Sequence, residues 1–456
     1  MWRSRSPAGF RRALQSGVVV AVLALVAAGC GSSANSNSSS AAGGGGAAAS
    51  SGGSAGGSSM TIADVAPFTG TDGALGPTYL VSCDAASSAI NAAGGVLGHH
   101  LNCKAVDTRG DPADAVPAVH QMYASGSPRL VIGCTSDEAA SVAPIFGANK
   151  TVSFCMTGQA EFDHVKFPYF YRLVPPDLSE SYAMTAIAQK KGYKRVALAF
   201  GNDIGSQTFV GPAIAAIKKA GMSVVANETL DLNATTFRTE AAKIVNAKPD
   251  VIFTEALGPT EASFLTEVKQ LNGGKMIPVI GTSATISPDW YKSVAAAVGA
   301  STLASNFSAD NLVTETSGPA YQAFSKAMFA EKGKVGSTGN FATYLTAPGA
   351  VHLYDGINLA ALAMLAAHST SPSAFMPYII KIGDGTPGAV VVHSFAAGAA
   401  ALKAGKQIRY VGPGGPTSFD AYHDSAGLFQ TDTYSPSGAV KVSGNIPVSQ
   451  LRALGL

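Results

Sequence analysis

Two strand-to-helix turns lie within one short stretch, and they constrain the fold more than any other feature of the chain. Residues 130–158 read as an apolar strand, a glycine turn, a helix, a β-branched strand and a second glycine turn. This order is typical of a parallel sheet with crossover helices. Ligands bind at the carboxyl ends of such strands, so Ser136 and Thr157 are predicted to point toward one cleft.

The same alternation of strands and helices runs from Met60 to about residue 298, and it includes helices predicted at residues 112–125 and 206–220. A pair of prolines, Pro175 and Pro176, interrupts it, because consecutive prolines favour an extended segment. Residues 319–382 are mainly helical in pattern, and the tail from Arg409 on is rich in glycine and proline. We therefore predict an α/β protein with two doubly wound parallel-sheet lobes, between which the chain crosses several times.

The first thirty residues are predicted to be an export signal. Four arginines precede an uncharged apolar run at residues 18–26, which is shorter than the about 20 residues that span a bilayer core. The sequence Ala-Ala-Gly-Cys at residues 27–30 resembles a bacterial lipobox. We therefore expect residues 1–29 to be a lipoprotein signal peptide and Cys30 to anchor the protein by lipid to the outer face of the cell membrane. The alternative is ordinary secretory cleavage, which would leave Cys30 as a free thiol.

Residues 30–59 are predicted to be a flexible tether. After Cys30 they are almost entirely Gly, Ser, Ala and Asn, a composition that buries little apolar surface. A random coil of this length spans about 30 Å. The folded part is thus expected to begin near Met60 and to stay close to the membrane.

Composition and motifs exclude several classes of function. The 456 residues carry a net charge of +2, only 13% of them are charged, and no basic stripe is interleaved with aromatic residues, so nucleic acid is not an expected partner. The sequence has neither the G-x-S-x-G turn of hydrolases nor the H-E-x-x-H motif of metalloproteases. Its glycine-rich segments follow neither the dinucleotide spacing nor the phosphate-loop spacing. No cofactor and no metal are therefore predicted.

Four cysteines remain once Cys30 is set aside, and an even number in an exported chain indicates two disulfides. Four cysteines allow three pairings. Cys134 and Cys155 fall at the carboxyl ends of adjacent predicted strands, and Cys83 falls in the first helix, which packs against the strand of Cys103. The expected disulfides are therefore Cys83–Cys103 and Cys134–Cys155. A metal site is the rival interpretation, but the spacing offers no C-x-x-C and no paired histidines.

Five stretches in order resemble the leucine/isoleucine/valine-binding proteins, the type I periplasmic substrate-binding proteins of ABC importers. They are AINAAGGVLGHHL (residues 89–101) with VDTRGDPADAV (106–116), the helix at 181–191, KRVALAFGNDIG (194–205), YDGINLAALAM (354–364) and RYVGPGGPTSFDAYHD (409–424). The resemblance covers about residues 60–430, nearly all of the chain after the predicted tether.

This resemblance implies two lobes joined by three crossover strands, with the ligand cleft between the lobes. The crossovers are expected near residues 172–176, 303–309 and 408–418. Lobe 1 would comprise residues 60–174 and 309–408, and lobe 2 residues 175–308 and 409–456. Ligand would close the lobes about these hinges, and the closed form would dock on an ABC permease that works with an ATPase.

The resemblance also assigns candidate ligand-binding residues. In lobe 1 the hydroxyls of Ser136 and Thr157, beside Gly158, would hold a carboxylate of the ligand. Residues at strand ends of lobe 2 would cover the other end of the ligand: Asp203, Glu255, Leu257 and Ser283. A purely structural role competes with these assignments, since Ser136 begins a predicted helix and is a good N-cap. Asp137 and Glu138, which follow it, would repel an anion if they faced it.

Three positions depart from the family pattern and leave the ligand open. Ile204 stands where amino-acid binders often have an aromatic residue, and Leu75 stands in place of an aromatic residue in the loop after the first strand. Ser283 stands where they have an acid for the α-ammonium group. Glu255 or Asp203 could replace that acid; otherwise the ligand lacks an amine, because an unpaired buried ammonium is costly. A branched or other amino acid, an amide and an amine-free organic acid are all candidates.

The sequence thus predicts an extracytoplasmic solute-binding lipoprotein, not an enzyme, which delivers a small molecule to an ABC permease. The small molecule would be an amino acid or a related organic acid or amide. One alternative is a ligand-sensing lipoprotein without transport, which would have the same fold. The other is a lipid-anchored hydrolase, which would need a base for Ser136, and none is evident in the sequence.

Overall fold

The structure is a computed structural model in which residues 58–70, 72, 73, 75–164, 167–334, 341–425 and 427–455 are described. All of them belong to one compact unit, Gly56–Leu456. The predicted signal peptide, Cys30 and nearly all of the predicted tether lie outside the described residues.

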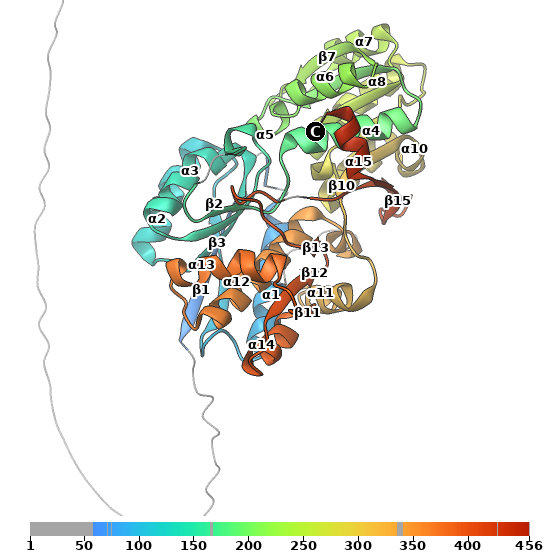
Figure 1. Cartoon of the computed structure of the whole chain (residues 1–456). Coiled ribbons are helices and arrows are strands. Elements are labelled where there is room, and N and C mark those ends of the chain that lie inside the picture. Colours follow the sequence, from blue (N-terminus) through green and yellow to red (C-terminus); the bar gives the residue numbers. More distant parts are fainter. Residues whose placement is uncertain are drawn as a thin grey trace, which may run out of the picture. The chain divides into compact units, whose positions relative to one another are not determined.

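A five-stranded parallel sheet of order β2-β1-β3-β4-β5 forms the centre of the first lobe (Figure 1). Its strands are β1 (Ser59–Ala66), β2 (His100–Asp107), β3 (Leu130–Thr135), β4 (Val152–Met156) and β5 (Phe170–Arg172). Two pairs of helices cover the two faces: α1 (Gly76–Ala92) with α12 (Pro348–Ala367), and α2 (Pro112–Ser125) with α3 (Ser136–Ala148). Because both faces are covered, strands such as β3 are buried at every residue.

A seven-stranded sheet of order β15-β14-β10-β9-β8-β6-β7 forms the centre of the second lobe. Its strands are β6 (Arg195–Gly201), β7 (Ser223–Leu230), β8 (Val251–Glu255), β9 (Val279–Gly281), β10 (Phe307–Leu312), β14 (Phe429–Tyr434) and β15 (Val440–Ile446). One face packs on α4 (Asp177–Lys190), α6 (Val210–Lys219) and α15 (Val448–Leu454), and the other on α7 (Arg238–Ala247), α8 (Gly258–Leu271) and α9 (Pro288–Val298). The short helices α5 (Ile204–Gln207) and α10 (Ala300–Asn306) complete this lobe.

The chain between β10 and β14 adds a helical layer and a small sheet to the first lobe. Its elements are α11 (Gly318–Ala330), α12, α13 (Pro372–Asp384), β11 (Val390–Val392), α14 (Phe395–Lys403), β12 (Ile408–Gly412) and β13 (Gly415–Pro416). Short 3-10 turns lie at Ala160–Phe162, Ser283–Thr285 and Phe341–Leu345. Among the described helices α12 alone is long and apolar enough to cross a membrane, but most of it is buried in the core of this lobe.

The predicted fold class is confirmed, with a doubly wound sheet in each lobe, although β14 and β15 join the second sheet antiparallel. Two of the expected lobe boundaries lie elsewhere. Because β10 pairs with β9, the second crossing follows Leu312 instead of preceding residue 309. Because β12 pairs with β11 and Phe419 packs in the first core, the third crossing lies just before Phe429 instead of at residues 408–418.

Both predicted disulfides are present in the first lobe. Cys83 of α1 is bonded to Cys103 of β2, and Cys134 of β3 is bonded to Cys155 of β4. The second bond joins adjacent strands, since Gly133 and Cys155 are partners in the sheet register. It therefore holds together the two strand ends from which the predicted hydroxyls of the site project.

A buried ion cluster fixes the places where the chain leaves the first lobe. Arg172, at the end of β5, is fully buried, and its Nε donates to Asp424 Oδ1 while its Nη2 donates to Asp163 Oδ1, each at 2.7 Å. Its Nη1 donates to the carbonyl oxygen of Gln159 at 3.1 Å. Arg172 stands just before the first crossing and Asp424 just before the third. The cluster therefore joins two crossing segments that are far apart in the sequence.

Replacing Arg172 with methionine is expected to lower the free energy of unfolding by about 3–5 kcal/mol, because the buried carboxylate of Asp424 and the partly buried one of Asp163 lose their charge partner. Urea denaturation followed by circular dichroism measures this loss. The control is Arg109→Met, which removes an exposed ion pair with Asp114 and should cost less than about 1 kcal/mol. Equal losses in the two variants would contradict a structural role for the cluster.

Candidate functional site

The carboxyl ends of strands from both sheets meet at one cavity of about 470 Å³. In each sheet, successive crossovers leave toward opposite faces at one point: between β1 and β3 in the first lobe, and between β6 and β8 in the second. This is where open parallel sheets bind ligands, because the diverging loops leave a crevice there. The segments that follow these four strands all line the cavity. A smaller inner extension of about 110 Å³ shares several lining residues with it.

The structure brings most of the predicted site residues to this cavity. Ser136, Asp203, Glu255 and Leu257 line the main cavity, and Gly158 and Ser283 line the inner extension. Thr157 lies next to Ser136, whose Oγ donates to Thr157 Oγ1 at 3.1 Å. Thr157 itself is fully buried behind Ser136 and donates to Gln159 Oε1 at 3.2 Å. The two hydroxyls are therefore neighbours, as predicted, but only that of Ser136 reaches the cavity.

The N-terminus of α3, beside these hydroxyls, is capped by Glu138 of the same helix. Thr135, and not Ser136, precedes the first turn of α3, and its N–H donates to Glu138 Oε1 at 3.0 Å. Thr135 Oγ1 also donates to the Glu138 carboxylate. Burial raises the pKa of Glu138 to about 7. Glu138 thus turns inward, and its carboxylate occupies part of the helix terminus that an anionic ligand would use.

Two carboxyl groups that are not among the predicted ligand-binding residues face the cavity from the first lobe. Asp72 lies in the loop after β1, and Asp137 lies in the first turn of α3 after β3. Asp137 Oδ1 accepts a hydrogen bond from the N–H of Gly205, in the second lobe, at 3.1 Å. The available signal was their position in the segments that follow the two strands at the switch point of the sheet.

The second lobe adds acidic groups on the opposite wall. Asp203 caps α5, since its Oδ1 accepts from the N–H of Ser206 at 2.7 Å, while its Oδ2 is buried without a hydrogen-bond partner in the described part of the chain. Glu255 accepts a hydrogen bond from Thr282 Oγ1. Burial raises the pKa of Glu255 well above its usual value. Asp289 also lines this wall.

The inner extension supplies an acid beside Ser283, the position at which this chain lacks the acid of the family pattern. The backbone N–H of Ser283 donates to Glu180 Oε1 at 2.7 Å, so a carboxylate from α4 stands beside it. Asp177 accepts from Thr208 Oγ1, and its own N–H donates to the carbonyl of Gly158 at 2.7 Å. A Cβ at Gly158 would collide with the Asp177 carboxylate and with the backbone carbonyl of Pro175, so a larger residue would displace both.

The ionisable side chains that line the main cavity, in the described part of the chain, include several carboxyl groups and no basic group. Burial and the neighbouring carboxyl groups raise the pKa of Asp72 to about 8, and burial and Asp203 raise that of Asp137 to about 6. Among the described residues that line the cavity and its extension there is no lysine, arginine or histidine. The described residues also hold no group of three or more His, Cys, Asp or Glu side chains arranged for a metal ion.

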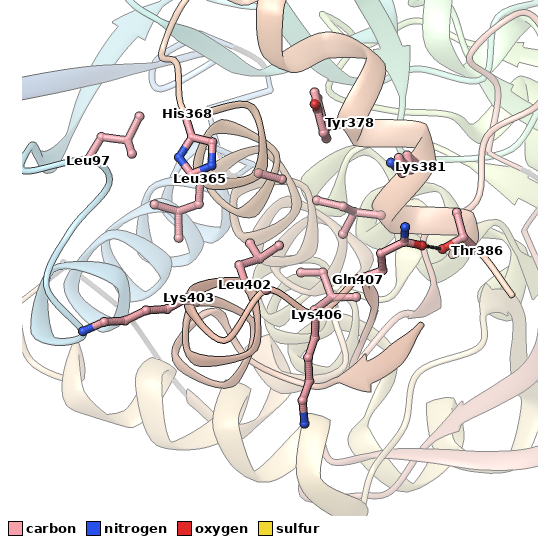
Figure 2. Close-up of a pocket in the computed structure, with 15 residues that line it drawn as sticks. Leu97, Leu365, His368, Tyr378, Lys381, Thr386, Leu402, Lys403, Lys406 and Gln407 are labelled. Carbon is pink, nitrogen blue, oxygen red and sulfur yellow. Dashed lines mark hydrogen bonds between the residues drawn. The ribbon is translucent and has the colours of Figure 1, made fainter. Parts of the chain in front are cut away.

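A second cavity of about 420 Å³ lies beside α12, α13 and α14, entirely within the first lobe (Figure 2). Apolar side chains such as Leu365 and Leu402 line it together with Lys381, Lys403 and Lys406. No residue of the second lobe lines it, so lobe closure could not cover a ligand there. The cavity between the lobes is therefore the candidate site.

Comparisons with known proteins identify the family and the fold. The family described as periplasmic binding protein matches residues 59–434. No curated protein sequence matches the chain. Solved structures with the same fold include a leucine-binding protein from Thermotoga maritima, with 18% identity, a TM-score of 0.67 and coverage of 86% of this chain and 99% of that one.

Two other solved structures have the same fold and different ligands in their descriptions. One is a solute-binding protein of an ABC transporter from R. palustris in complex with benzoate, with 18% identity, a TM-score of 0.66 and coverage of 85% of this chain and 96% of that one. The other is a fatty acid ABC transporter substrate-binding protein from Thermomonospora curvata, with 14% identity, a TM-score of 0.68 and coverage of 88% and 94%. At these identities the likeness establishes the fold and not the ligand.

The raised pKa of Asp72 predicts that the empty protein loses stability as the pH rises. The Asp72 carboxyl keeps its proton in the folded state up to about pH 8 but loses it near pH 4 in the unfolded state. The free energy of unfolding therefore falls as the pH rises from about 4 to about 8, because the unfolded state releases this proton and the folded state does not. Asp72→Asn should therefore be more stable than the natural protein at pH 8, by about 2 kcal/mol or more, and nearly equal to it at pH 4.

Urea denaturation at the two pH values measures the difference. The control is Asp384→Asn, which removes an exposed carboxyl at the end of α13 and should show the same stability difference at both pH values. A gain for Asp72→Asn that does not change with pH would show that Asp72 is ionised in the folded protein.

Proposed function

Because this chain belongs to the periplasmic binding protein family, we propose that it captures a small solute outside the cytoplasm, between its two lobes, and delivers it to an ABC permease and its ATPase. The observation that carries this proposal is the cavity between the switch points of the two sheets, to which both lobes contribute side chains. A ligand enclosed there contacts both lobes at once. It therefore binds the closed arrangement more tightly than the open one, which is what drives closure.

One contact between the lobes supports a role for closure. Asp137 in α3 accepts a hydrogen bond from Gly205 in α5 at the edge of the cavity, and this bond exists only when the two lobes are close. A Cβ at Gly205 would lie 3.3 Å from the Cβ of Ser136, so the backbones of α3 and α5 approach closely here. The closed form, with both lobes in place, would be the one that docks productively on the permease.

The ligand-binding residues of the proposal are the predicted site residues that line the cavity and its extension. They are Ser136, Gly158, Asp203, Glu255, Leu257 and Ser283. Thr157 takes part indirectly, because it receives the hydrogen bond from Ser136 and so orients that hydroxyl. Asp72 and Asp137 join the set from the first lobe.

The chain is proposed to be a binding protein and not a hydrolase. The nucleophile that a hydrolase would need is Ser136, but its hydroxyl donates to Thr157 and not to a base. Among the described residues no histidine lines the cavity. A sensor that reports the ligand to a membrane partner without transport would use the same closure. Growth on the solute as sole nutrient, with and without the gene, separates transport from sensing.

Ligand-driven closure is expected to make the protein more compact. A compound that raises the melting temperature of the whole chain should also reduce its radius of gyration in small-angle X-ray scattering, because the lobes approach each other. The control is Asp384→Asn, which should close as the natural protein does. A compound that stabilises the protein without compaction would contradict closure as the mechanism.

Anchoring by a lipid on Cys30 is part of the proposal and explains the export signal before it and the tether after it. Cells that express the natural protein should hold it in the membrane fraction and incorporate labelled palmitate into it. Cys30→Ser should abolish the label and change the fractionation, while ligand binding remains. A labelled Cys30→Ser protein would rule out this site of attachment.

A further inference from the structure

The charges of the cavity point to a class of ligand. We propose that the solute is an organic cation, an amine or guanidinium compound without a carboxylate, held between acidic groups of the two lobes. This inference rests on the proposed solute-binding function and specifies the ligand of the same site.

Four carboxyl groups converge on the cavity from the switch points of the two sheets. Asp72 and Asp137 follow β1 and β3, and Asp203 and Glu255 follow β6 and end β8. The convergence is close: a Cβ built on Gly205 would lie 3.4 Å from Asp203 Oδ1 and 3.7 Å from Asp137 Oδ2. Carboxyl groups of opposite lobes thus flank one point at the edge of the cavity.

No side chain in the described part of the cavity neutralises these groups. Its lining contains no basic residue. The buried Arg172 is committed to Asp163 and Asp424. A buried cluster of acids without a cation is costly, and in the empty cavity protons reduce the cost, as the raised pKa values of Asp72 and Asp137 indicate. A cationic ligand would take the place of those protons.

One polar group of the lining is left without a partner. Tyr79 is only 6% exposed and lines both the cavity and its extension, yet its hydroxyl has no hydrogen-bond partner among the described residues. An ammonium or guanidinium group can donate to this hydroxyl, and its charge is attracted to an aromatic face such as that of Tyr79.

A ligand carboxylate fits this cavity poorly. The hydroxyl of Ser136 already donates to that of Thr157, and Glu138 accepts from the N–H of Thr135, directly before α3. Asp137, in the same helical turn, also lines the cavity. A carboxylate at Ser136 would therefore meet carboxylates where it needs free donors, and the repulsion would offset the hydrogen bonds it gained.

The rest of the cavity wall is partly apolar and suits the hydrocarbon part of a ligand. Leu75 and Met156 contribute apolar side chains from the first lobe, and Leu257 and Trp290 contribute them from the second. A cavity of about 470 Å³ lies in the range of sites that hold small organic molecules. The ligand is therefore expected to be an amine or guanidinium compound with a hydrocarbon chain or ring, and not a bare inorganic ion.

Compounds that differ only by a carboxylate test this inference most directly. Agmatine, putrescine and phenethylamine are the decarboxylated forms of arginine, ornithine and phenylalanine, and 3-phenylpropionate and 4-methylvalerate serve as carboxylates without an amine. Isothermal titration calorimetry on the whole chain at pH 8 compares the sets. We expect at least one amine to bind, about tenfold or more tightly than the matching amino acid.

The outcomes separate this inference from the function on which it rests. Binding by amino acids or carboxylates in preference to the matching amines would overturn the cationic ligand and leave solute binding standing. No binding by any compound of the three sets would count against both.

Charge-neutral variants locate the contact. Asp203→Asn should weaken binding of the amine by about tenfold or more, because it removes the negative charge that the amine faces. Asp137→Asn should weaken it similarly while keeping an acceptor for the N–H of Gly205. Asp384→Asn, outside the cavity, should leave affinity unchanged. Circular dichroism melting curves show whether each variant is folded, and unchanged affinity in both folded cavity variants would overturn the proposal.

The direction of the pH dependence gives an independent readout. The titratable groups around the cavity are acidic: Asp72, Asp137, Asp203, Glu255 and Asp289 line it, with Glu138, Asp177 and Glu180 next to them. An amine with a pKa of about 10 stays charged from pH 5.5 to 8.5, while the carboxyl groups of Asp137 and Asp72 lose their protons. Affinity for the amine should therefore rise over that range. A fall in affinity would mean that the site prefers an anion.

Discussion

The constraint on which the site depends is the topology of two doubly wound parallel sheets whose carboxyl edges face each other. In each sheet the crossovers diverge at one point, and the chain that leaves the strands on either side cannot fill the crevice. Residues in the segments that follow these four strands therefore line a common cavity, whatever their chemistry. In this chain they include Asp72, Asp137 and Asp203, and Glu255 ends β8, so the topology gathers carboxyl groups that the sequence spreads over nearly two hundred residues.

The carboxyl groups of the two lobes couple ligand binding to lobe closure. When the lobes approach, carboxyl groups of the first lobe move toward those of the second, and their ionised forms repel each other across a poorly solvated cavity. Protons relieve the repulsion in the empty protein, and the hydrogen bond from Gly205 to Asp137 opposes it. With an organic cation between the lobes the same groups attract the ligand from both sides. The differential affinity that closure requires would then come mainly from electrostatics.

Much of the local structure could be predicted because local chemistry decides it. The helix predicted at residues 112–125 has those bounds, and both disulfides follow from cysteines on adjacent elements. The prediction failed where distant contacts decide. β10 reads FSADNL, with polar residues that look like a loop, but Asn311 donates to Asp432 in β14 at 2.7 Å, and the strand is buried. The helix predicted at residues 206–220 is divided into α5 and α6, and α14 was not predicted.

The sequence by itself determined the α/β class, the two lobes and the placing of Ser136, Asp203 and Glu255 at strand ends, because periodicity and turn residues are local properties. The tertiary structure decided which neighbours those residues meet. It placed Thr157 behind Ser136, turned Glu138 inward onto Thr135 and set Asp137 against Gly205. Some of these contacts join segments across a sheet or between lobes, and the contact of Glu138 depends on one rotamer among several. Local sequence does not determine them, because the packing of the whole chain selects them.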